Sequence, residues 1–208
     1  MASISWRKDG AERAQIEGLI KEVEAMCSAE IVITVRPRSG AYRQADVLFG
    51  AICAFVGLCV YIYAPTEFTD DLVPPALLLL FAAGAVFCAN VAPLRRLLLP
   101  RALRERQVRA AAREAFLDQG IAGTRDRTGI LIYISVFERR AEVVTDIGIL
   151  RRESDGQPGE AIRGIERAVA EALPMEGFVS AVRGLGAWLK EALPPRADDI
   201  NELSDEVR

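Results

Sequence analysis

The sequence predicts a layered α/β domain that is interrupted by a two-helix transmembrane hairpin. Amphipathic helical patterns alternate with short runs of β-branched residues, which is typical of helices and strands packed in layers. Two apolar stretches, 47–64 and 72–92, lie inside this polar chain, and neither contains a charged residue. A helix needs roughly 20 apolar residues to cross a hydrocarbon core of about 30 Å. Both stretches are therefore predicted to span a membrane rather than to form buried core helices.

The first helix and strand precede the hairpin. Residues 9–27 carry apolar side chains at helical spacing opposite a charged face, which indicates an amphipathic helix. Residues 31–35, with the sequence IVITV, indicate a buried strand. In the second apolar stretch Pro74 and Pro75 should fall in the first helical turn, where a missing N–H costs least. After the hairpin, residues 101–119 repeat the helical pattern, and Gly120 is a stop signal.

A β-hairpin and two helices are predicted to complete the domain. Gly129 opens the apolar run ILIYISV, which indicates a central strand buried on both faces. Residues 137–140 form a turn, and the run AEVVT returns the chain as a second strand. A polar loop over 151–159 is followed by two amphipathic helices that Pro174 separates.

These elements divide the chain into four segments. Residues 1–44 and 93–195 are the two parts of the α/β domain, 45–92 is the transmembrane hairpin, and 196–208 is an acidic tail. The hairpin replaces part of the crossover between the first and second strands, and loop-closure entropy makes such an insertion tolerable. The carboxyl end of the first strand and the start of the next helix should therefore face the bilayer.

The charges beside the spans predict the orientation of the hairpin. Three arginines precede the first span, seven follow the second, and the connection PTEFTDD has no Lys or Arg. Lys and Arg stay on the cytoplasmic side of short loops. No signal peptide is recognised, because the first fifteen residues lack an apolar centre. We expect a multi-pass protein of the inner (plasma) membrane with both termini in the cytoplasm.

Some of the arginines after the second span are candidates for contact with lipid headgroups. The basic residues expected to face the membrane are Arg95, Arg96, Arg101 and Arg104. Each could attract anionic lipid with about 1 kcal/mol near the surface. The positive-inside bias alone accounts for them equally well, so both interpretations stay open.

Composition excludes several classes of function. The net charge of −3 argues against nucleic-acid binding, which needs a basic face. The chain has no histidine, which excludes a Ser-His-Asp triad, a Cys-His pair and a histidine-ligated zinc. Its four cysteines lack the spacing of a metal finger or a redox motif, so we interpret them as small buried side chains.

Residues 124–148, TRDRTGILIYISVFERRAEVVTDIG, resemble the core signature of the TPM-domain family. That signature has a glycine-led apolar strand, a turn with an acidic–Arg pair, a second strand and a glycine-containing corner. The stretch Ser39 to Tyr42 and the ending Asn201–Glu202–Leu203 are similar to the bacterial membrane subgroup, in which a hairpin is inserted. The chain has Asp146–Ile147–Gly148 where many relatives have a glycine–aromatic–glycine turn.

The resemblance implies a small three-layer α/β/α domain of Rossmann-like appearance. Some members of the family are described as acid phosphatases or as calcium-binding, and plant members serve photosystem repair. Most bacterial members have no settled activity, so the resemblance leaves open whether this chain is an enzyme.

Three carboxylates near the predicted β-hairpin are the candidates for chemistry. Asp126 and Asp146 should lie near one end of the strand pair, and Glu138 at the other. Two carboxylates with loop carbonyls can bind Ca²⁺ or Mg²⁺, and a bound cation could polarise a phosphate ester. The alternative is that Asp126 and Asp146 only cap turns. Glu138, with Arg139 or Arg140, is expected in a solvated turn rather than a site. Arg125 and Arg127 could contact a phosphate, but beside a glycine turn such arginines are more often solvated.

Three functions follow from these observations. The first is a membrane-anchored interaction or regulatory module that binds a protein partner or a second copy. The alternative is a membrane-tethered, metal-assisted (acid) phosphatase. A channel is disfavoured, because the spans contain no ionisable residue. Small residues at Gly50, Gly57 and 82–85 are expected to pack the hairpin together or to support a homo-oligomer.

Overall fold

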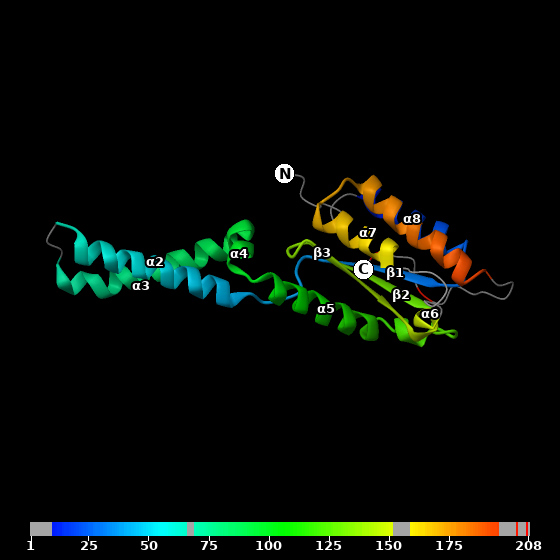
Figure 1. Cartoon of the computed structure of the whole chain (residues 1–208). Helices are drawn as coiled ribbons and strands as arrows, with labels where there is room; N and C mark the ends of the chain where they lie inside the picture. Colours follow the sequence, from blue (N-terminus) through cyan, green and yellow to red (C-terminus); the bar gives the residue numbers. More distant parts are fainter. Residues whose placement is uncertain (1–9, 66–68, 152–158, 196–202, 204–206, 208) are drawn as a thin grey trace. The chain divides into compact units, whose positions relative to one another are not determined.

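The computed structural model describes residues 10–65, 69–151, 159–195, 203 and 207 (Figure 1). The chain forms two compact units. One, which we call the α/β unit, consists of Met1–Ser39 and Glu105–Arg208. The other, the hairpin unit, is Gly40–Arg104. The fold class is mixed α/β, as predicted.

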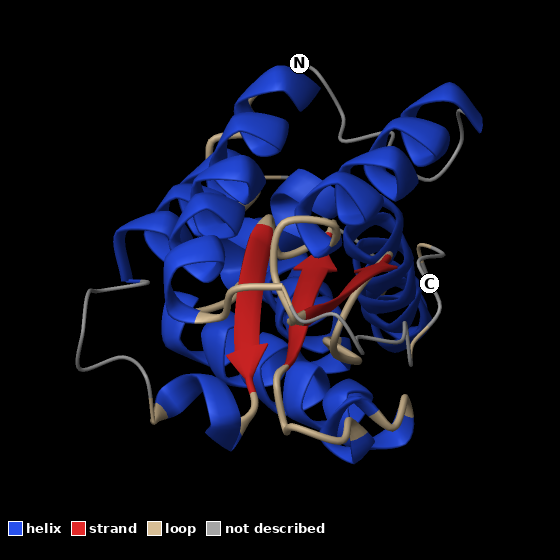
Figure 2. Ribbon diagram, turned by 90° about the vertical axis from the view of Figure 1, so that its right-hand side faces the viewer, coloured by secondary structure: helices blue, strands red, loops and turns tan. Residues whose placement is uncertain are grey.

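A three-stranded sheet lies at the centre of the α/β unit (Figure 2). The strands β1 Glu30–Arg36, β2 Gly129–Ser135 and β3 Arg140–Thr145 lie in that order. β1 pairs with β2 in parallel, and β2 pairs with β3 antiparallel. Every residue of β2 is buried. The strands and the β-hairpin that the sequence predicts are confirmed.

Two buried clusters lie on opposite faces of this sheet, because successive side chains of a strand alternate between faces. Ile130, Ile132 and Ile134 of β2 belong to one cluster, with the helices α1 Gly10–Glu24, α7 Gly159–Ala170 and α8 Met175–Ala192. Leu131 and Tyr133 belong to the other, with the part of α5 Arg101–Asp118 that follows Arg104. All four helices were predicted, and their apolar faces supply the core.

Three short elements of this unit have no long apolar pattern. They are η2 Ile121–Gly123, α6 Ile147–Leu150 and the turn Val136–Arg139 between β2 and β3. The sequence predicted the turn but not the two short helices. A single helical turn is too short to show helical periodicity.

The hairpin unit contains the two long apolar helices, α2 Arg43–Tyr63 and α3 Val73–Asn90. The short helices η1 Asp70–Leu72 and α4 Ala92–Leu98 come before and after α3. Pro74 and Pro75 lie in the first turn of α3, as predicted. Both long helices are long and apolar enough to cross a membrane, and only 11% of each apolar window is buried within the molecule.

Glycines bring α2 and α3 close together. A Cβ added at Gly50 would lie 2.6 Å from the Phe81 carbonyl oxygen, and one at Gly84 would lie 2.7 Å from the Cys53 Sγ. Both distances are shorter than van der Waals contact, so the close approach requires glycine. The small residues that the sequence singled out therefore include positions packed inside the hairpin.

Candidate functional site

A group of polar side chains collects where β1 and β2 end. These strands are parallel and end opposite each other, at Arg36 and Ser135. Ser39 follows β1, and Glu138 lies in the turn after β2. In open α/β sheets, ligands bind outside the carboxyl ends of the parallel strands. This edge of the sheet is therefore a natural position for a functional site.

Four side chains form one connected network, which we call the serine–glutamate cluster: Ser39, Tyr133, Ser135 and Glu138. The Ser39 N–H donates to Glu138 Oε1 at 2.9 Å, and the Ser135 hydroxyl donates to Glu138 Oε2. The Ser39 Oγ lies 2.7 Å from the Ser135 Oγ and 3.2 Å from the Tyr133 hydroxyl. The cluster ties the segment after β1 to the turn after β2.

Backbone hydrogen bonds reinforce the same connection. The Val136 N–H donates to the Arg36 carbonyl, and the Phe137 N–H donates to the Pro37 carbonyl. Arg139 in this turn has φ 52, in the left-handed region that a residue with a side chain seldom adopts. The turn is thus held by long-range contacts, which compensate for a strained residue.

Three members of the cluster, Tyr133, Ser135 and Glu138, are buried, and Ser39 is partly exposed. Glu138 is 1% exposed and Ser135 is fully buried. Burial raises the pKa of Tyr133, the Ser39 hydrogen bond lowers it, and the charge of Glu138 raises it again. The phenol therefore stays protonated at neutral pH. Because Glu138 and Ser135 are both buried, a substrate has no direct access to their side chains in this conformation.

The expectation that Glu138 lies in a solvated turn is wrong. Its carboxylate accepts a backbone N–H from residue 39, about a hundred positions earlier in the chain. A local pattern contains no information about such a partner. From sequence alone, an acidic residue followed by two arginines therefore predicts a solvated turn.

Asp146 lies at the opposite end of the β2–β3 pair. It is 4% exposed, and its two oxygens accept bonds from Arg127 at 2.8 and 3.0 Å. The Ile147 N–H also donates to Asp146 Oδ1 at 2.7 Å, which makes Asp146 the N-cap of α6. The neighbouring carboxylate raises the pKa of Arg127, first by the hydrogen bond and then by its charge.

Asp126, the other predicted metal ligand, has an exposed side chain. Its backbone carbonyl packs against Gly148: an added Cβ there would lie 2.6 Å from the Asp126 oxygen and 2.5 Å from the Arg127 oxygen. Within the described ranges, no three Asp, Glu or Cys side chains gather as a metal site would require. Asp126 and Asp146 are at the same end of the sheet, and Ca²⁺ or Mg²⁺ binding by them stays a prediction.

Sequence reasoning missed the polar partner of Arg95 in the hairpin unit. Asp46, in the first turn of α2, pairs with Arg95 of α4, and the two side chains are 14% and 11% exposed. Arg95 is thus occupied within the unit. Arg96 and Arg104 are partly buried, whereas Arg101 is exposed. Contact of these residues with lipid stays a prediction, and Arg101 is the most accessible of the four for it.

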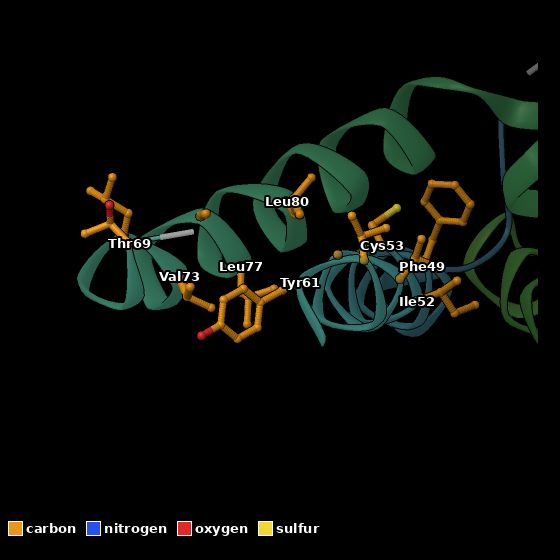
Figure 3. Close-up of a pocket in the computed structure, with 13 residues that line it drawn as sticks. Phe49, Ile52, Cys53, Tyr61, Thr69, Val73, Leu77 and Leu80 are labelled. Carbon is orange, nitrogen blue, oxygen red and sulfur yellow. The ribbon is translucent and has the colours of Figure 1, made fainter. Parts of the chain in front are cut away.

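An apolar groove runs between α2 and α3, with a volume of about 620 Å³ (Figure 3). Tyr61 lines the groove, and its hydroxyl donates to Asp70 Oδ1 at 2.6 Å. Among the described residues that line it, the groove has few polar groups, and they do not converge as in a specific ligand site. Its lining includes Phe49, Ile52, Cys53, Val56, Leu77 and Leu80.

Comparisons with known proteins support the fold. No protein-family model matches the chain, and no curated protein matches it significantly. The structure is similar to the NMR structure of the BA42 protein from the psychrophilic bacterium Bizionia argentinensis, with a TM-score of 0.59. The alignment covers 100% of this chain and 98% of that one, with 17% sequence identity. At this identity the likeness shows the fold alone.

Proposed function

We propose that this protein is a membrane-anchored α/β domain that works as an interaction or regulatory module at the cytoplasmic face of the inner membrane. The observation that carries the proposal is the exposure of α2 and α3. Two long apolar helices with 11% of each window buried form a compact unit of their own. In water such a unit would be unstable, and in a bilayer it would be solvated.

The exposed apolar side chains of α2 and α3 determine how much free energy the hairpin unit gains when lipid replaces water around it. Phe55, Leu78 and Leu79 are each at least 65% exposed. Burying one large apolar side chain gains about 1.5–3 kcal/mol, and soluble proteins rarely expose apolar patches beyond a few hundred Å². In lipid, a helix makes the hydrogen bonds of its backbone N–H and C=O groups internally, so α2 and α3 can be surrounded by acyl chains. The Asn90 side-chain amide also donates to the Val86 carbonyl at 2.7 Å, which lowers the cost of placing it near the end of a span.

The same proposal includes membership of the TPM-domain family, in its bacterial membrane subgroup, with a Rossmann-like three-layer α/β/α domain. The residues 124–148 that carry the resemblance occupy β2, the turn, β3 and the start of α6. Helix-lined core clusters on both faces of the sheet support the layered arrangement.

The serine–glutamate cluster favours an interaction module over an enzyme, because its side chains have a structural role. Ser39 is the last residue before the hairpin unit begins at Gly40. The cluster thus fixes the point where the chain leaves the sheet for its anchor. Its buried hydroxyls and carboxylate hold this connection in place. The partner would be another protein or a second copy of this chain.

The topology is tested by cysteine labelling in a cysteine-free background. Thr69, before η1, and Lys190, in α8, are both exposed. In spheroplasts a membrane-impermeant maleimide should label Thr69→Cys but label Lys190→Cys only after permeabilisation. The protein should also stay in the membrane pellet after alkaline carbonate. Labelling of Lys190→Cys from outside, or release by carbonate, would overturn the proposal.

A metal-assisted phosphatase is the alternative function, with Asp126 and Asp146 as the ligands of Ca²⁺ or Mg²⁺. Both aspartates lie at one end of the sheet, although Arg127 already neutralises Asp146. Hydrolysis of p-nitrophenyl phosphate by the purified protein, stimulated by either cation and lost in both Asp126→Ala and Asp146→Ala, would replace the module by the enzyme. A thermal midpoint unchanged by millimolar Ca²⁺ or Mg²⁺ would exclude the cation site.

A further inference from the structure

A second polar site lies at the edge of the sheet in the α/β unit, between β3 and α7. It is a pocket of about 280 Å³. Arg140 and Ala141 line it from β3, and Arg163, Glu166, Arg167 and Ala170 line it from α7. Three guanidinium groups and one carboxyl group thus surround one small cavity.

The two arginines of α7 lack ion pairs of the kind that Arg127 and Arg183 make in this unit. Arg163 and Arg167 are four residues apart on the same side of the helix, and both are exposed. Like charges at this spacing destabilise a helix by a few tenths of a kcal/mol. Within the described part of the chain neither guanidinium makes a hydrogen bond or a salt bridge. Their charge is therefore available to a ligand.

Arg140 is only weakly engaged. Its Nη1 lies 2.8 Å from Glu105 Oε1, in a pair whose side chains are 42% and 43% exposed. Exposed pairs of this kind contribute about 0–1 kcal/mol, so a ligand anion can compete for this guanidinium. Arg109 and Glu142 form a further exposed pair beside the pocket.

Glu166 is half-buried among these arginines. Burial raises the pKa of its carboxyl, Glu142 raises it further, and Arg140, Arg109 and Arg163 lower it. With Glu166 ionised, the lining has an excess of two positive charges. A divalent anion would balance that excess, whereas a single carboxylate would leave half of it unmatched.

We propose that the pocket between β3 and α7 binds the phosphate group of an anionic ligand. Guanidinium forks bind the oxygens of phosphate two at a time, which is why arginine dominates phosphate sites. The cavity has room for a phosphate and a small substituent but is at the lower limit for a larger ligand. The phosphate could belong to a soluble phosphomonoester or to the headgroup of an anionic lipid.

Inorganic phosphate is the probe for the first experiment. Its binding to the full-length protein in a non-ionic detergent is measured by calorimetry and by the thermal midpoint, against sodium chloride at the same ionic strength. The double variant Arg163→Gln/Arg167→Gln should bind phosphate at least tenfold more weakly. The control Arg183→Gln, which removes an exposed arginine of α8 that pairs with Glu22, should bind as the wild type does.

A third variant is expected to strengthen phosphate binding instead of weakening it. Glu166→Gln removes the negative charge of the pocket and supplies an amide donor, so phosphate should bind severalfold more tightly. A residue with only a structural role would not increase affinity. The proposal would be overturned if the wild type did not bind phosphate, or if sodium chloride had the same effect as phosphate. It would also be overturned if neither the double arginine variant nor Glu166→Gln changed the affinity for phosphate.

The source of the phosphate is distinguished in nanodiscs. The protein is reconstituted in phosphatidylcholine, with or without phosphatidic acid, which carries a phosphomonoester headgroup. If the site takes lipid headgroups, phosphatidic acid will weaken the binding of free phosphate to the wild type but not change the residual binding of the double variant. If it takes soluble compounds, the two lipid compositions will give the same affinity. Both results presuppose that the wild-type pocket between β3 and α7 binds phosphate.

Discussion

At the scale of single residues, Glu138 has a buried carboxyl group whose two oxygens are both hydrogen-bonded. An ionised carboxylate costs several kcal/mol when it leaves water without partners. Here one oxygen accepts the Ser39 N–H and the other accepts the Ser135 hydroxyl. Both donors come from the ends of the two parallel strands. The carboxylate is thus a bridge between segments that are distant in sequence.

Replacing Glu138 by alanine should destabilise the α/β unit by about 2–3 kcal/mol, because the buried Ser135 hydroxyl and the partly buried Ser39 N–H lose their acceptor. The measurement is urea unfolding followed by near-UV circular dichroism in detergent. Glu105→Ala is the matched control: it breaks the exposed pair with Arg140 and should cost less than about 1 kcal/mol. Equal costs for the two variants would contradict the bridging role of Glu138.

Glu166 provides a prediction that depends on pH. Burial raises its pKa above the ordinary value of 4.5, so the folded state holds the proton more tightly than the unfolded state does. Ionisation above the raised pKa therefore costs stability, and this cost vanishes below pH 4.5. In phosphate-free buffer, Glu166→Gln should have a higher thermal midpoint than the wild type at pH 7 to 8. The difference should shrink as the pH falls and disappear below 4.5.

The candidate residues differ in how far the sequence could locate them. Chain order alone placed Asp126 and Asp146 at the same end of the strand pair. It could not show that Arg127, at φ 59, turns its guanidinium onto Asp146. Glu138 was misjudged, since its partner Ser39 comes from another part of the chain. The arginine pocket was missed for a similar reason: β3 and α7 meet only in three dimensions.

At the scale of elements, α8 contains two glycines with opposite surroundings. An added Cβ at Gly184 would meet nothing within 4 Å. One at Gly186 would lie 2.8 and 3.0 Å from the two methyl carbons of Val23, in α1. Valine is stiff at χ1 and cannot move its methyls aside without moving its backbone. Gly186 thus sets the distance between α1 and α8.

Alanine at these two positions should therefore have opposite effects. Gly184→Ala should stabilise the unit by about 0.5–1 kcal/mol, because alanine favours the helix and nothing obstructs its methyl group. Gly186→Ala should destabilise it by about 1–2 kcal/mol, as overpacking exceeds the gain in propensity. Both are measured by urea unfolding in the same detergent. A stabilising Gly186→Ala would mean that α1 and α8 do not pack as closely as described.

Long periodic elements were predictable, and short ones were not. The helix expected over 101–119 is α5, Arg101–Asp118, and the strand expected over 31–35 is β1, Glu30–Arg36. Their many apolar positions make the pattern unambiguous. By contrast, α6 depends on one side chain, the Asp146 cap, and α4 lies in a segment of leucines and arginines. Such short elements are stabilised by individual contacts, and the spacing of apolar residues in the sequence does not predict these contacts.

At the scale of the whole molecule, two compact units in one chain should lose their structure separately. In detergent micelles the helices α2 and α3 keep their backbone hydrogen bonds shielded from urea, whereas the α/β unit is solvated by water. Trp188 of α8 packs against the larger core cluster and reports on the α/β unit. In a Trp6→Phe variant, its fluorescence should show one cooperative transition.

After that transition, far-UV circular dichroism should retain the helical signal of the hairpin unit. The matched measurement without detergent, on material kept soluble by amphipathic polymer, should give the same order of events. If the helical signal and the Trp188 fluorescence disappear together, the two units do not unfold independently. That result would also weaken the proposal of a lipid-solvated hairpin.

The parallel pairing of β1 with β2 has a consequence for how the protein is made. Glu30 pairs with Gly129, so about a hundred residues must be synthesised before β1 finds its neighbour. At roughly 5–20 residues per second, β1 waits on the order of 5–20 s on a growing chain, with its hydrogen-bonding edges open. During that interval the hairpin unit is synthesised, and in the topology proposed above it enters the membrane before β2 exists. A chain whose synthesis stops before residue 129 therefore leaves β1 without its parallel neighbour, and its open edge is a site for pairing with other chains.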